Sequence, residues 1–415
     1  MLKLTPATQP RTTARRPTIG LAIAGGGPLG AIYELGALQA IDEAIDGVHM
    51  HDLDIYVGVS SGAFLSASLA NRITACQMAR VFMSSPDAEY AFHPEIFLRP
   101  AFREYLGRAA SLPGVLFEML GEMIRHPERL TSLESVEGLS RLIPTGIFDN
   151  ANIGAFVAEA LGKPGRSNDF RQLQAKLRIV AVELDTGQAV RFGEPGNDHV
   201  PISTAVQASA ALPGLYPPVE IDGHYYVDGA LRRTLHASVA LEKGADLLFA
   251  INPLVPFDAD GVMPDHGAPR DRMVRGGLPV VLSQTFRSLI QSRMQVGMRK
   301  YETAYPASAL MLVEPNRNDE KMFYTNVFSY ASRSELAEHA YQTTRRELSE
   351  RADELEAFLE PFNLGLNRQV LESRQTLNDS LQREPVHFAP VGNSLDRTLD
   401  SLERLLREDT RIASK

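Results

Sequence analysis

Two strand-turn-helix units follow one another near the N-terminus, and they constrain the fold more than any other feature of this 415-residue chain. The apolar segment TIGLAIA (18–24) enters a glycine-rich turn, after which residues 31–45 carry apolar side chains at helical spacing. A second apolar segment, DIYVGV (54–59), ends at Ser60, and a helical pattern resumes at once. This alternation predicts an α/β fold in which helices cover both faces of a mostly parallel central sheet.

Changes in composition along the chain predict how it is organised. Residues 1–17 contain Lys and Arg among Thr and Pro, and we expect a flexible basic N-terminus there. The α/β domain follows over residues 18–330, with a helical insertion at about 91–142, where prolines interrupt apolar helices. Residues 331–415 are charged and helical in pattern, which predicts a C-terminal helical extension.

Two helical segments carry apolar stripes, and each stripe has two interpretations. The segment 112–125, within the insertion, fits a lid or a face that enters lipid, and it also fits ordinary core packing. The segment 395–406 fits a helix packed on its own domain, and also a helix through which two copies of the chain associate. The stripes consist of Leu112, Leu116, Met119, Leu120 and Met123, and of Leu395, Leu399, Leu402 and Leu406.

Charge and composition narrow the classes of function. The net charge of -9 argues against nucleic acid as a partner, because binding phosphates requires a basic face. The single cysteine, Cys76, excludes an internal disulfide and a multi-thiolate zinc site, and its helical surroundings favour a packed thiol. The first eighteen residues lack an apolar segment long enough for a signal peptide, and no segment has the run of about 20 apolar residues that spans a bilayer. We expect a cytoplasmic protein, with peripheral contact to a membrane left open.

The segment Gly58-Val59-Ser60-Ser61-Gly62 stands where a predicted strand ends and a helix begins. A serine on such a sharp turn is held away from the backbone, and flanking glycines allow strain and the close approach of neighbouring segments. The helix N-terminus behind the serine favours negative charge that develops during acyl transfer. The segment therefore predicts a nucleophile at Ser60.

The glycine-rich turn over residues 25–30 matches the pattern G-x-G-x-x-G. Backbone N–H groups at the start of a helix can bind the pyrophosphate of a dinucleotide or the oxyanion of an acyl-transfer intermediate. A dinucleotide site needs an acid at the end of the second strand, but Asp52 and Asp54 lie at the start of that strand and Ser60 at its end. The oxyanion interpretation is therefore favoured.

The segment Asp228-Gly229-Ala230 follows the apolar run YYV. A carboxylate at a strand end beside a glycine can serve as base toward a hydroxyl, although Asp-Gly is also ordinary turn chemistry. A Ser-His-Asp triad is an alternative, with His224 or His236 as the histidine nearest to the acid in sequence. Neither histidine lies in a segment that presents it convincingly, because one follows a turn and the other opens a helix-like stretch.

Taken in this order, AGGGPLGAIYELGALQAI, YVGVSSGA and ASAALPGLYPPVEIDGHYYVDGAL resemble the patatin-like phospholipase family, over about residues 19–253. The resemblance implies a three-layer α/β/α fold, no metal or organic cofactor, and hydrolysis of acyl esters in phospholipids or other lipids. It also implies a Ser-Asp dyad, with Ser60 as the nucleophile and Asp228 as its base. It assigns Gly25, Gly26, Gly27 and Gly30 to an oxyanion hole, and it assigns Gly58, Gly62 and Gly229 to the family motifs.

One position departs from the family pattern. Members often carry Arg or Lys just before the last glycine of the turn, whereas this chain has Leu29 there, preceded by Pro28. Backbone amides can still form the oxyanion hole, so the departure bears on the substrate head group more than on the reaction. An esterase or thioesterase for soluble acyl compounds would share all of these residues. A non-catalytic fold that binds acyl chains or a partner is a further alternative.

Overall fold

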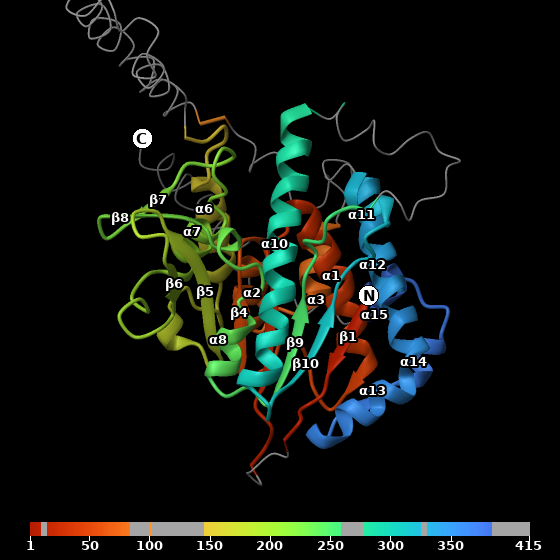
Figure 1. Cartoon of the computed structure of the whole chain (residues 1–415). Coiled ribbons are helices and arrows are strands. Elements are labelled where there is room, and N and C mark those ends of the chain that lie inside the picture. Colours follow the sequence, from red (N-terminus) through yellow and green to blue (C-terminus); the bar gives the residue numbers. More distant parts are fainter. Residues whose placement is uncertain are drawn as a thin grey trace, which may run out of the picture.

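A central sheet carries the fold, and nine of the described strands belong to it (Figure 1). These strands are β1 (Leu2–Thr5), β2 (Ile19–Ile23), β4 (Ile55–Gly58), β5 (Lys176–Glu183), β6 (Ala189–Phe192), β7 (Val219–Ile221), β8 (His224–Asp228), β9 (Leu247–Ile251) and β10 (Ala309–Val313). Their order is β1-β10-β9-β2-β4-β5-β8-β7, with β6 also paired to β5. The five strands from β10 to β5 in this order are parallel, while β1, β6 and β8 run against their neighbours.

The structure, a computed structural model, describes residues 1–9, 15–83, 100–101, 145–258, 275, 277–324 and 330–383. Apart from Pro100 and Ala101, the expected insertion at about 91–142, including the stripe over 112–125, lies outside the described residues. The leucine stripe over 395–406 lies outside them as well.

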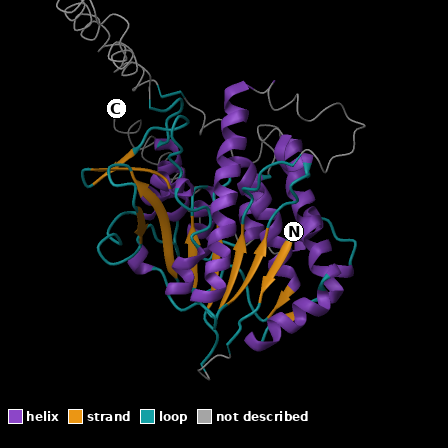
Figure 2. Ribbon diagram, viewed as in Figure 1, coloured by secondary structure: helices purple, strands orange, loops and turns teal. Residues whose placement is uncertain are grey.

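Helices cover both faces of the sheet (Figure 2). The α-helices are α1 (Gly27–Ala44), α2 (Ser61–Ala70), α3 (Ala75–Phe82), α6 (Ala151–Leu161), α7 (Ile202–Ser209), α8 (Ala237–Glu242), α10 (Gly277–Ala304), α11 (Glu320–Tyr324), α12 (Tyr330–Glu350), α13 (Ala352–Leu359), α14 (Arg368–Glu372) and α15 (Leu377–Arg383). Short 3-10 helices are η3 (Phe170–Gln172), η4 (Gly229–Leu231) and η7 (Glu360–Phe362), and a two-stranded sheet joins β3 (Ile45–Asp46) to β11 (Gly365–Leu366).

Side chains that alternate along the strands pack into two separate cores. In β2, Leu21 and Ile23 belong to the core that contains α1, α2 and α12, whereas Ala22 belongs to the core that contains α8 and α10. This alternation follows from the two-residue period of a strand. The three-layer α/β/α fold with a mostly parallel sheet, which the sequence predicted, is confirmed.

The N-terminus differs from the flexible segment expected over residues 1–17. Leu2–Thr5 forms β1, which pairs antiparallel with β10 at one border of the sheet. Leu2 is buried in the core, and the Lys3 ammonium forms an ion pair with the Glu314 carboxylate. Four residues of alternating pattern were too few to stand out among the neighbouring Thr, Pro and Arg residues.

The C-terminal segment packs on the same body through a close helix crossing. At Gly36 in the middle of α1, an added Cβ would lie 2.4 Å from the Ala337 carbonyl oxygen of α12. Ala337, Ala340 and Tyr341 are fully buried at this crossing. The described part of the predicted C-terminal extension is therefore helical and shares the core of the α/β domain.

Candidate active site

Ser60 stands on a strained turn between β4 and α2. Its φ of 52° and ψ of -122° lie where few non-glycine residues are found, and such strain often accompanies a functional position. The flanking glycines are required by packing: a Cβ on Gly58 would lie 2.4 Å from the Gly62 carbonyl oxygen, and a Cβ on Gly62 would lie 2.3 Å from the Ile23 carbonyl oxygen. The turn that the sequence predicted is therefore present, with Ser60 only 8% exposed.

A hydrogen-bond chain from α7 fixes the backbone of this turn. The Ser60 N–H donates to the Ser209 hydroxyl at 2.9 Å, and that hydroxyl donates to the Val180 carbonyl oxygen at 2.6 Å. Ser209 is fully buried, so it has no competing water. Ser209 could not be recognised from the sequence, because a serine within an apolar helix resembles any small packed residue.

The register of β5 explains why Ser60 and Asp228 meet. β6 pairs along one edge of β5, so β4 and β8 share the other edge and run toward each other along it. β4 ends with Gly58 opposite Ile179. β8 ends with Asp228 opposite Ala181, two residues further along β5. Ser60 follows β4 directly, and its side chain is hydrogen-bonded to the Asp228 carboxylate.

Asp228 is buried and its charged form is disfavoured. Its side chain is 3% exposed, and burial raises its pKa from an ordinary value of 3.8 to about 6. Two hydrogen bonds act in the opposite direction: the Ala230 N–H donates to Oδ1 at 2.8 Å, and the Ser60 hydroxyl donates to the carboxylate. A carboxylate in this environment is a stronger base than an exposed aspartate.

Gly229 allows the Asp228 segment to lie against β5. A Cβ at this position would lie 2.2 Å from the Val180 carbonyl oxygen, the same oxygen that accepts from Ser209. Only a glycine avoids that overlap. The Asp-Gly pair therefore serves close approach here, in addition to ending a strand.

The glycine-rich turn packs tightly between Ser60 and the loop after β9. A Cβ on Gly25 would lie 2.8 Å from the Ser60 Cβ, and a Cβ on Gly26 would lie 2.5 Å from Cγ of Pro253. Gly27 has a φ of +60° and no atom within 4 Å of its ideal Cβ position, so its backbone faces open space. The Gly30 N–H donates to the Gly26 carbonyl oxygen at 3.0 Å, which starts the first turn of α1.

The start of α1 offers N–H groups near Ser60. The first N–H groups of a helix have no partner within the helix, and Pro28 has no N–H at all. The donors left at this turn are the amides of Gly26, Gly27 and Leu29. The Leu29 side chain packs against the core that contains α1, so this position supplies an apolar contact and no cation.

A buried carboxyl group lies under the turn. Glu34 on α1 is fully buried, and Oε2 accepts a hydrogen bond from the Ser61 hydroxyl at 3.3 Å. Burial raises the pKa of Glu34 well above its ordinary value, which favours the neutral acid. Glu34 could not be recognised from the sequence, since one acid in an amphipathic pattern normally indicates an exposed position.

The two histidines of the triad alternative have other partners. The His224 ring lies 2.7 Å from the Glu183 carboxylate and is largely exposed. His236 is buried with a φ of 47°, and its Nε2 lies 3.4 Å from the Gly229 carbonyl oxygen. Burial lowers the pKa of His236 to about 3, so its ring is neutral. The group that the structure pairs with Ser60 is Asp228.

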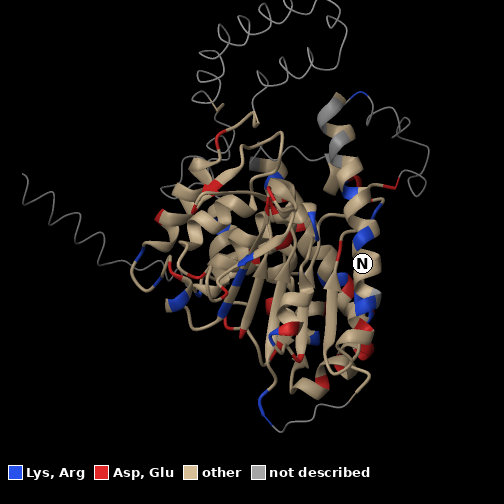
Figure 3. Ribbon diagram, turned by 60° about the vertical axis from the view of Figure 1, so that its left-hand side comes forward, with Lys and Arg blue, Asp and Glu red and all other residues tan. Residues whose placement is uncertain are grey.

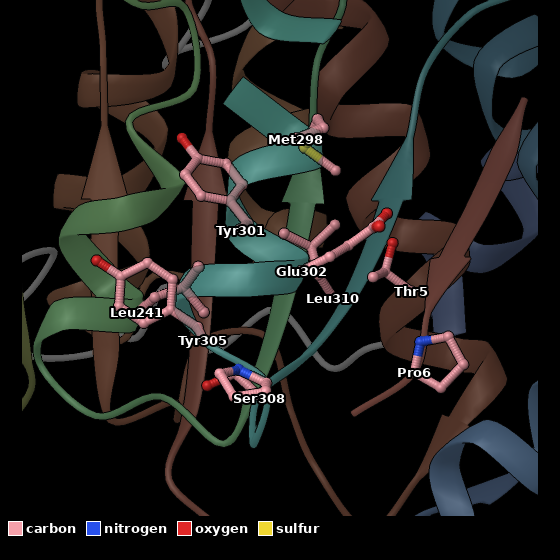
Figure 4. Close-up of a pocket in the computed structure, with 10 residues that line it drawn as sticks. Thr5, Pro6, Leu241, Met298, Tyr301, Glu302, Tyr305, Ser308 and Leu310 are labelled. Carbon is pink, nitrogen blue, oxygen red and sulfur yellow. The ribbon is translucent and has the colours of Figure 1, made fainter. Parts of the chain in front are cut away.

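Other features of the described residues lie away from this edge of the sheet. The hollow in Figure 4, lined by Tyr301, Tyr305 and Leu310 among others, lies where β10 begins, at the opposite edge from Ser60. Among the residues that the structure describes, no group of three His, Cys, Asp or Glu side chains is placed to hold a metal ion. None of the described helices is long and apolar enough to cross a membrane.

Comparison with known proteins identifies the family. Residues 21–241, more than half of the chain, match the family described as patatin-like phospholipase. The chain therefore belongs to the patatin-like phospholipase family, as its three motif segments predicted. At the level of the family, this is a class of lipid acyl hydrolases.

Solved structures of two bacterial proteins are similar to this chain. VipD from Legionella pneumophila has 14% sequence identity and a TM-score of 0.35, with 84% of this chain and 70% of that chain covered. ExoU from the type III secretion system of Pseudomonas aeruginosa, solved in complex with SpcU, has 16% identity and a TM-score of 0.26. That match covers 89% of this chain and 67% of the other. The family assignment rests on the sequence match.

Proposed function

We propose that this protein is a lipid acyl hydrolase of the phospholipase A or lysophospholipase type, in which Ser60 is the nucleophile and Asp228 its base. The observation that supports this best is the hydrogen bond between the two side chains, made by a serine on a strained turn and a carboxylate whose pKa is raised to about 6. A nucleophile within hydrogen-bond reach of a base of suitable pKa is what covalent acyl transfer requires.

The first half-reaction uses both residues. Asp228 accepts the hydroxyl proton of Ser60 while the serine oxygen attacks the ester carbonyl carbon and forms a tetrahedral oxyanion. The intermediate breaks its bond to the alcohol oxygen, which leaves with the proton from Asp228. Ser60 then carries the acyl group as an ester.

Water completes the reaction by the same proton path. It attacks the acyl carbon while Asp228 accepts its proton, and the new tetrahedral intermediate releases the fatty acid. The proton returns from Asp228 to the Ser60 oxygen, and the free enzyme is restored. With a pKa of about 6, Asp228 is mostly ionised at pH 7 and still basic enough to accept a proton.

The oxyanion is proposed to bind the amides of the glycine-rich turn. Gly26 and Gly27 lie at the start of α1 and follow Gly25, which contacts Ser60, and the exposed backbone of Gly27 leaves room for a substrate oxygen. Helix-start amides stabilise negative charge through hydrogen bonds and through the helix dipole. Losing one such donor costs about 10²–10³-fold in turnover in other enzymes.

The proposed catalytic domain is the whole of residues 18–330, with residues 331–415 as an extension packed on it. β9 and β10 lie beyond the residues that match the family, yet β9 pairs directly with β2. The proposed substrates are phospholipids or other lipid acyl esters, which the protein would meet by peripheral contact with a lipid surface.

The experiment that tests this function is fatty-acid release from phospholipid vesicles and from a short-chain soluble ester. Wild type is compared with Ser60→Ala, with Asp228→Asn, and with Ser61→Ala as a control for a neighbouring hydroxyl that lacks the Asp228 contact. We expect both dyad variants to lose at least about 10²-fold in kcat and the control to keep most activity. Cleavage of the short ester alone would instead indicate a soluble acyl substrate. Full activity of Asp228→Asn would contradict the dyad.

A further inference from the structure

The inner face of α10 continues past the sheet on the side where Ser60 lies. Asn252 is the first residue after β9, and its side-chain Nδ2 lies 3.2 Å from the sulfur of Met294. Met294 therefore marks the level on α10 at which β9 ends. Residues one to three turns nearer the start of α10 therefore stand beyond the carboxyl ends of the parallel strands, and Figure 1 shows α10 rising past the arrowheads of β9 and β10. In open α/β sheets, ligands bind at this edge.

Arg287 occupies this part of α10 as a buried cation without a counter-charge among the described residues. It is 9% exposed, and its Nη1 has no hydrogen-bond partner there. Burial alone lowers its pKa to about 10, and no described carboxylate contributes to the shift. A buried charge normally destabilises the folded state unless it is paired or hydrogen-bonded.

Arg345 shows what a structural arginine looks like in the same molecule. Its guanidinium lies 5.1 Å from the ring centroid of Tyr341, much as that of Arg287 lies 4.9 Å from the ring centroid of Phe323. Arg345, however, donates to the backbone carbonyl oxygens of Gln375 and Ser373 at 2.6 Å and 2.9 Å. Arg287 has the stacking contact, but among the described residues its Nη1 has no acceptor, so this donor is available to a ligand.

Gln291, one helical turn further along α10, has a second unsatisfied polar atom. Positions four residues apart lie on one helix face, so Gln291 and Arg287 are neighbours. Gln291 is 3% exposed and its Oε1 has no hydrogen-bond partner among the described residues. Cationic donors beside an amide oxygen, which can accept a hydrogen bond from a hydroxyl, suit a phosphate ester that carries a hydroxyl or glycerol group.

The loop after β9 connects this face of α10 to the glycine-rich turn. Pro253 packs against Gly26 and Gly30, and Gln284 of α10 bonds to both the N–H and the carbonyl oxygen of Phe257, at 3.2 Å and 2.9 Å. Only β2 separates β9 from β4, so the carboxyl ends of β9 and β4 are about 10 Å apart at the usual strand spacing. The loop after β9 therefore joins the face of α10 that carries Arg287 to the turn beside Ser60.

Positive and negative side chains are mixed along the part of the chain that the structure describes. Figure 3 shows Lys and Arg interspersed with Asp and Glu over the described ribbon. A mixed surface favours recognition by individually placed residues over attraction to a field of one sign.

We propose that Arg287, with Gln291 beside it, forms a subsite for the phosphate group of a phosphorylated acyl ester. This assignment rests on the proposed function and names its substrate class as phosphorylated glycerol esters. Guanidinium groups bind phosphate through paired N–H donors, which supplies the partner that Arg287 lacks.

Binding to a catalytically silent protein tests the subsite apart from hydrolysis. In Ser60→Ala, titration calorimetry compares dihexanoylphosphatidylglycerol, whose head group carries hydroxyls beside its phosphate, with dihexanoylglycerol, which has the same acyl groups and no phosphate. Arg287→Met, Arg287→Lys and the control Lys300→Met, which removes an exposed charge from the same helix, are each added to Ser60→Ala. We expect Arg287→Met to weaken binding of the phosphate-bearing lipid at least about tenfold and to leave the neutral lipid unchanged. Lysine should give a smaller loss, and the control none.

Thermal unfolding supplies a readout that separates a ligand site from a structural cation. If Arg287 serves a ligand, Arg287→Met should melt at or above the temperature of its parent, because a buried unpaired charge is replaced by an apolar chain that can pack on Phe323. A lower melting temperature, or equal weakening of both lipids, would overturn the proposal. Binding of inorganic phosphate as tight as that of the phosphate-bearing lipid would also overturn it, since the site would then be one for free phosphate. Hydrolysis of dihexanoylglycerol by wild type reports on the proposed function independently.

Discussion

The hydroxyl of Ser209 holds the backbone N–H of Ser60 at 2.9 Å, and it connects that N–H to the Val180 carbonyl oxygen on β5. Three segments that are distant in sequence meet at this hydroxyl, on α7, on β5 and on the turn after β4. At this turn no regular strand or helix offers an acceptor to the N–H of Ser60. The Ser209 hydroxyl accepts its hydrogen bond instead, and this bond helps to maintain the positive φ of Ser60.

Replacing Ser209 with alanine should therefore impair both stability and turnover. The buried N–H of Ser60 would lose its acceptor, at a cost of about 1–3 kcal/mol, and a looser turn should lower kcat by about tenfold or more. The matched control is Ser203→Ala on the same helix, whose hydroxyl accepts from the Asn168 amide at 2.9 Å, away from Ser60. Thermal unfolding and ester hydrolysis measure both effects. Equal kcat losses in the two variants would show that Ser209 has no special role.

The pH dependence of activity should follow Asp228. Only the ionised carboxylate can accept the serine proton, so kcat/KM should rise with pH through about 6 and then level off. A rise centred near pH 4 would mean that burial does not raise the pKa of this group. Initial rates of soluble-ester cleavage between pH 4 and 8 give the profile.

The same pKa predicts a stability effect of Asp228→Asn. The folded state favours the protonated acid, so the contribution of Asp228 to stability is fully present below about pH 4 and is lost as pH rises through about 6. The neutral asparagine keeps an oxygen for the Ala230 N–H and avoids this loss. The stability of the variant relative to wild type should thus increase by about 1–3 kcal/mol between pH 4 and pH 7.5, as measured by urea unfolding. If the difference in unfolding free energy between variant and wild type does not change with pH, the pKa of Asp228 is not raised in the folded state.

Two glycine substitutions in helices should have opposite effects. Gly36→Ala places a Cβ 2.4 Å from a backbone oxygen of α12 and should destabilise the protein by about 1–3 kcal/mol. Gly297→Ala, within α10, meets only the Tyr301 hydroxyl at 3.8 Å and should stabilise by about 0.5–1 kcal/mol through the helix propensity of alanine. Melting temperatures of the two variants decide this. A neutral Gly36→Ala would mean that α12 can move away from α1 at little cost.

His236→Asn should change kcat by less than about tenfold. Asparagine tolerates the left-handed backbone at this position, and the neutral histidine contacts a carbonyl oxygen of Gly229. If His236 were the base of a triad, its replacement should cost about as much as Asp228→Asn, or about 10²–10⁴-fold. Hydrolysis by the two folded variants, side by side, distinguishes the dyad from the triad.

The sequence predicted the elements that carry local periodicity and failed where the partner is distant. β2, β4 and the two helices after them were predictable because apolar spacing and glycine turns are short-range patterns. Ser60 and Asp228 could be predicted as candidate catalytic residues for the same reason. Their meeting could not be derived, because it depends on β4 and β8 sharing one edge of β5, and no local pattern encodes that register.

The missed features have a common physical cause. Glu34 and Ser209 act through buried hydrogen bonds, and such side chains resemble surface or filler residues in a sequence. The helix α10 went unassigned because the inner face of a helix is normally apolar, whereas Gln284, Arg287 and Gln291 interrupt its apolar stripe. Polar residues on a buried face weaken the pattern that reveals a helix, and they are also the residues worth testing for function.

The position of β9 has a consequence for shortened forms of this protein. The family match ends at residue 241, inside α8, yet β9 lies between β2 and β10 in the middle of the sheet. A chain cut at that boundary would leave β2 with a row of free N–H and C=O groups beside an apolar surface. Such an open border recruits strands from other molecules, so the truncated protein should aggregate instead of forming a smaller enzyme.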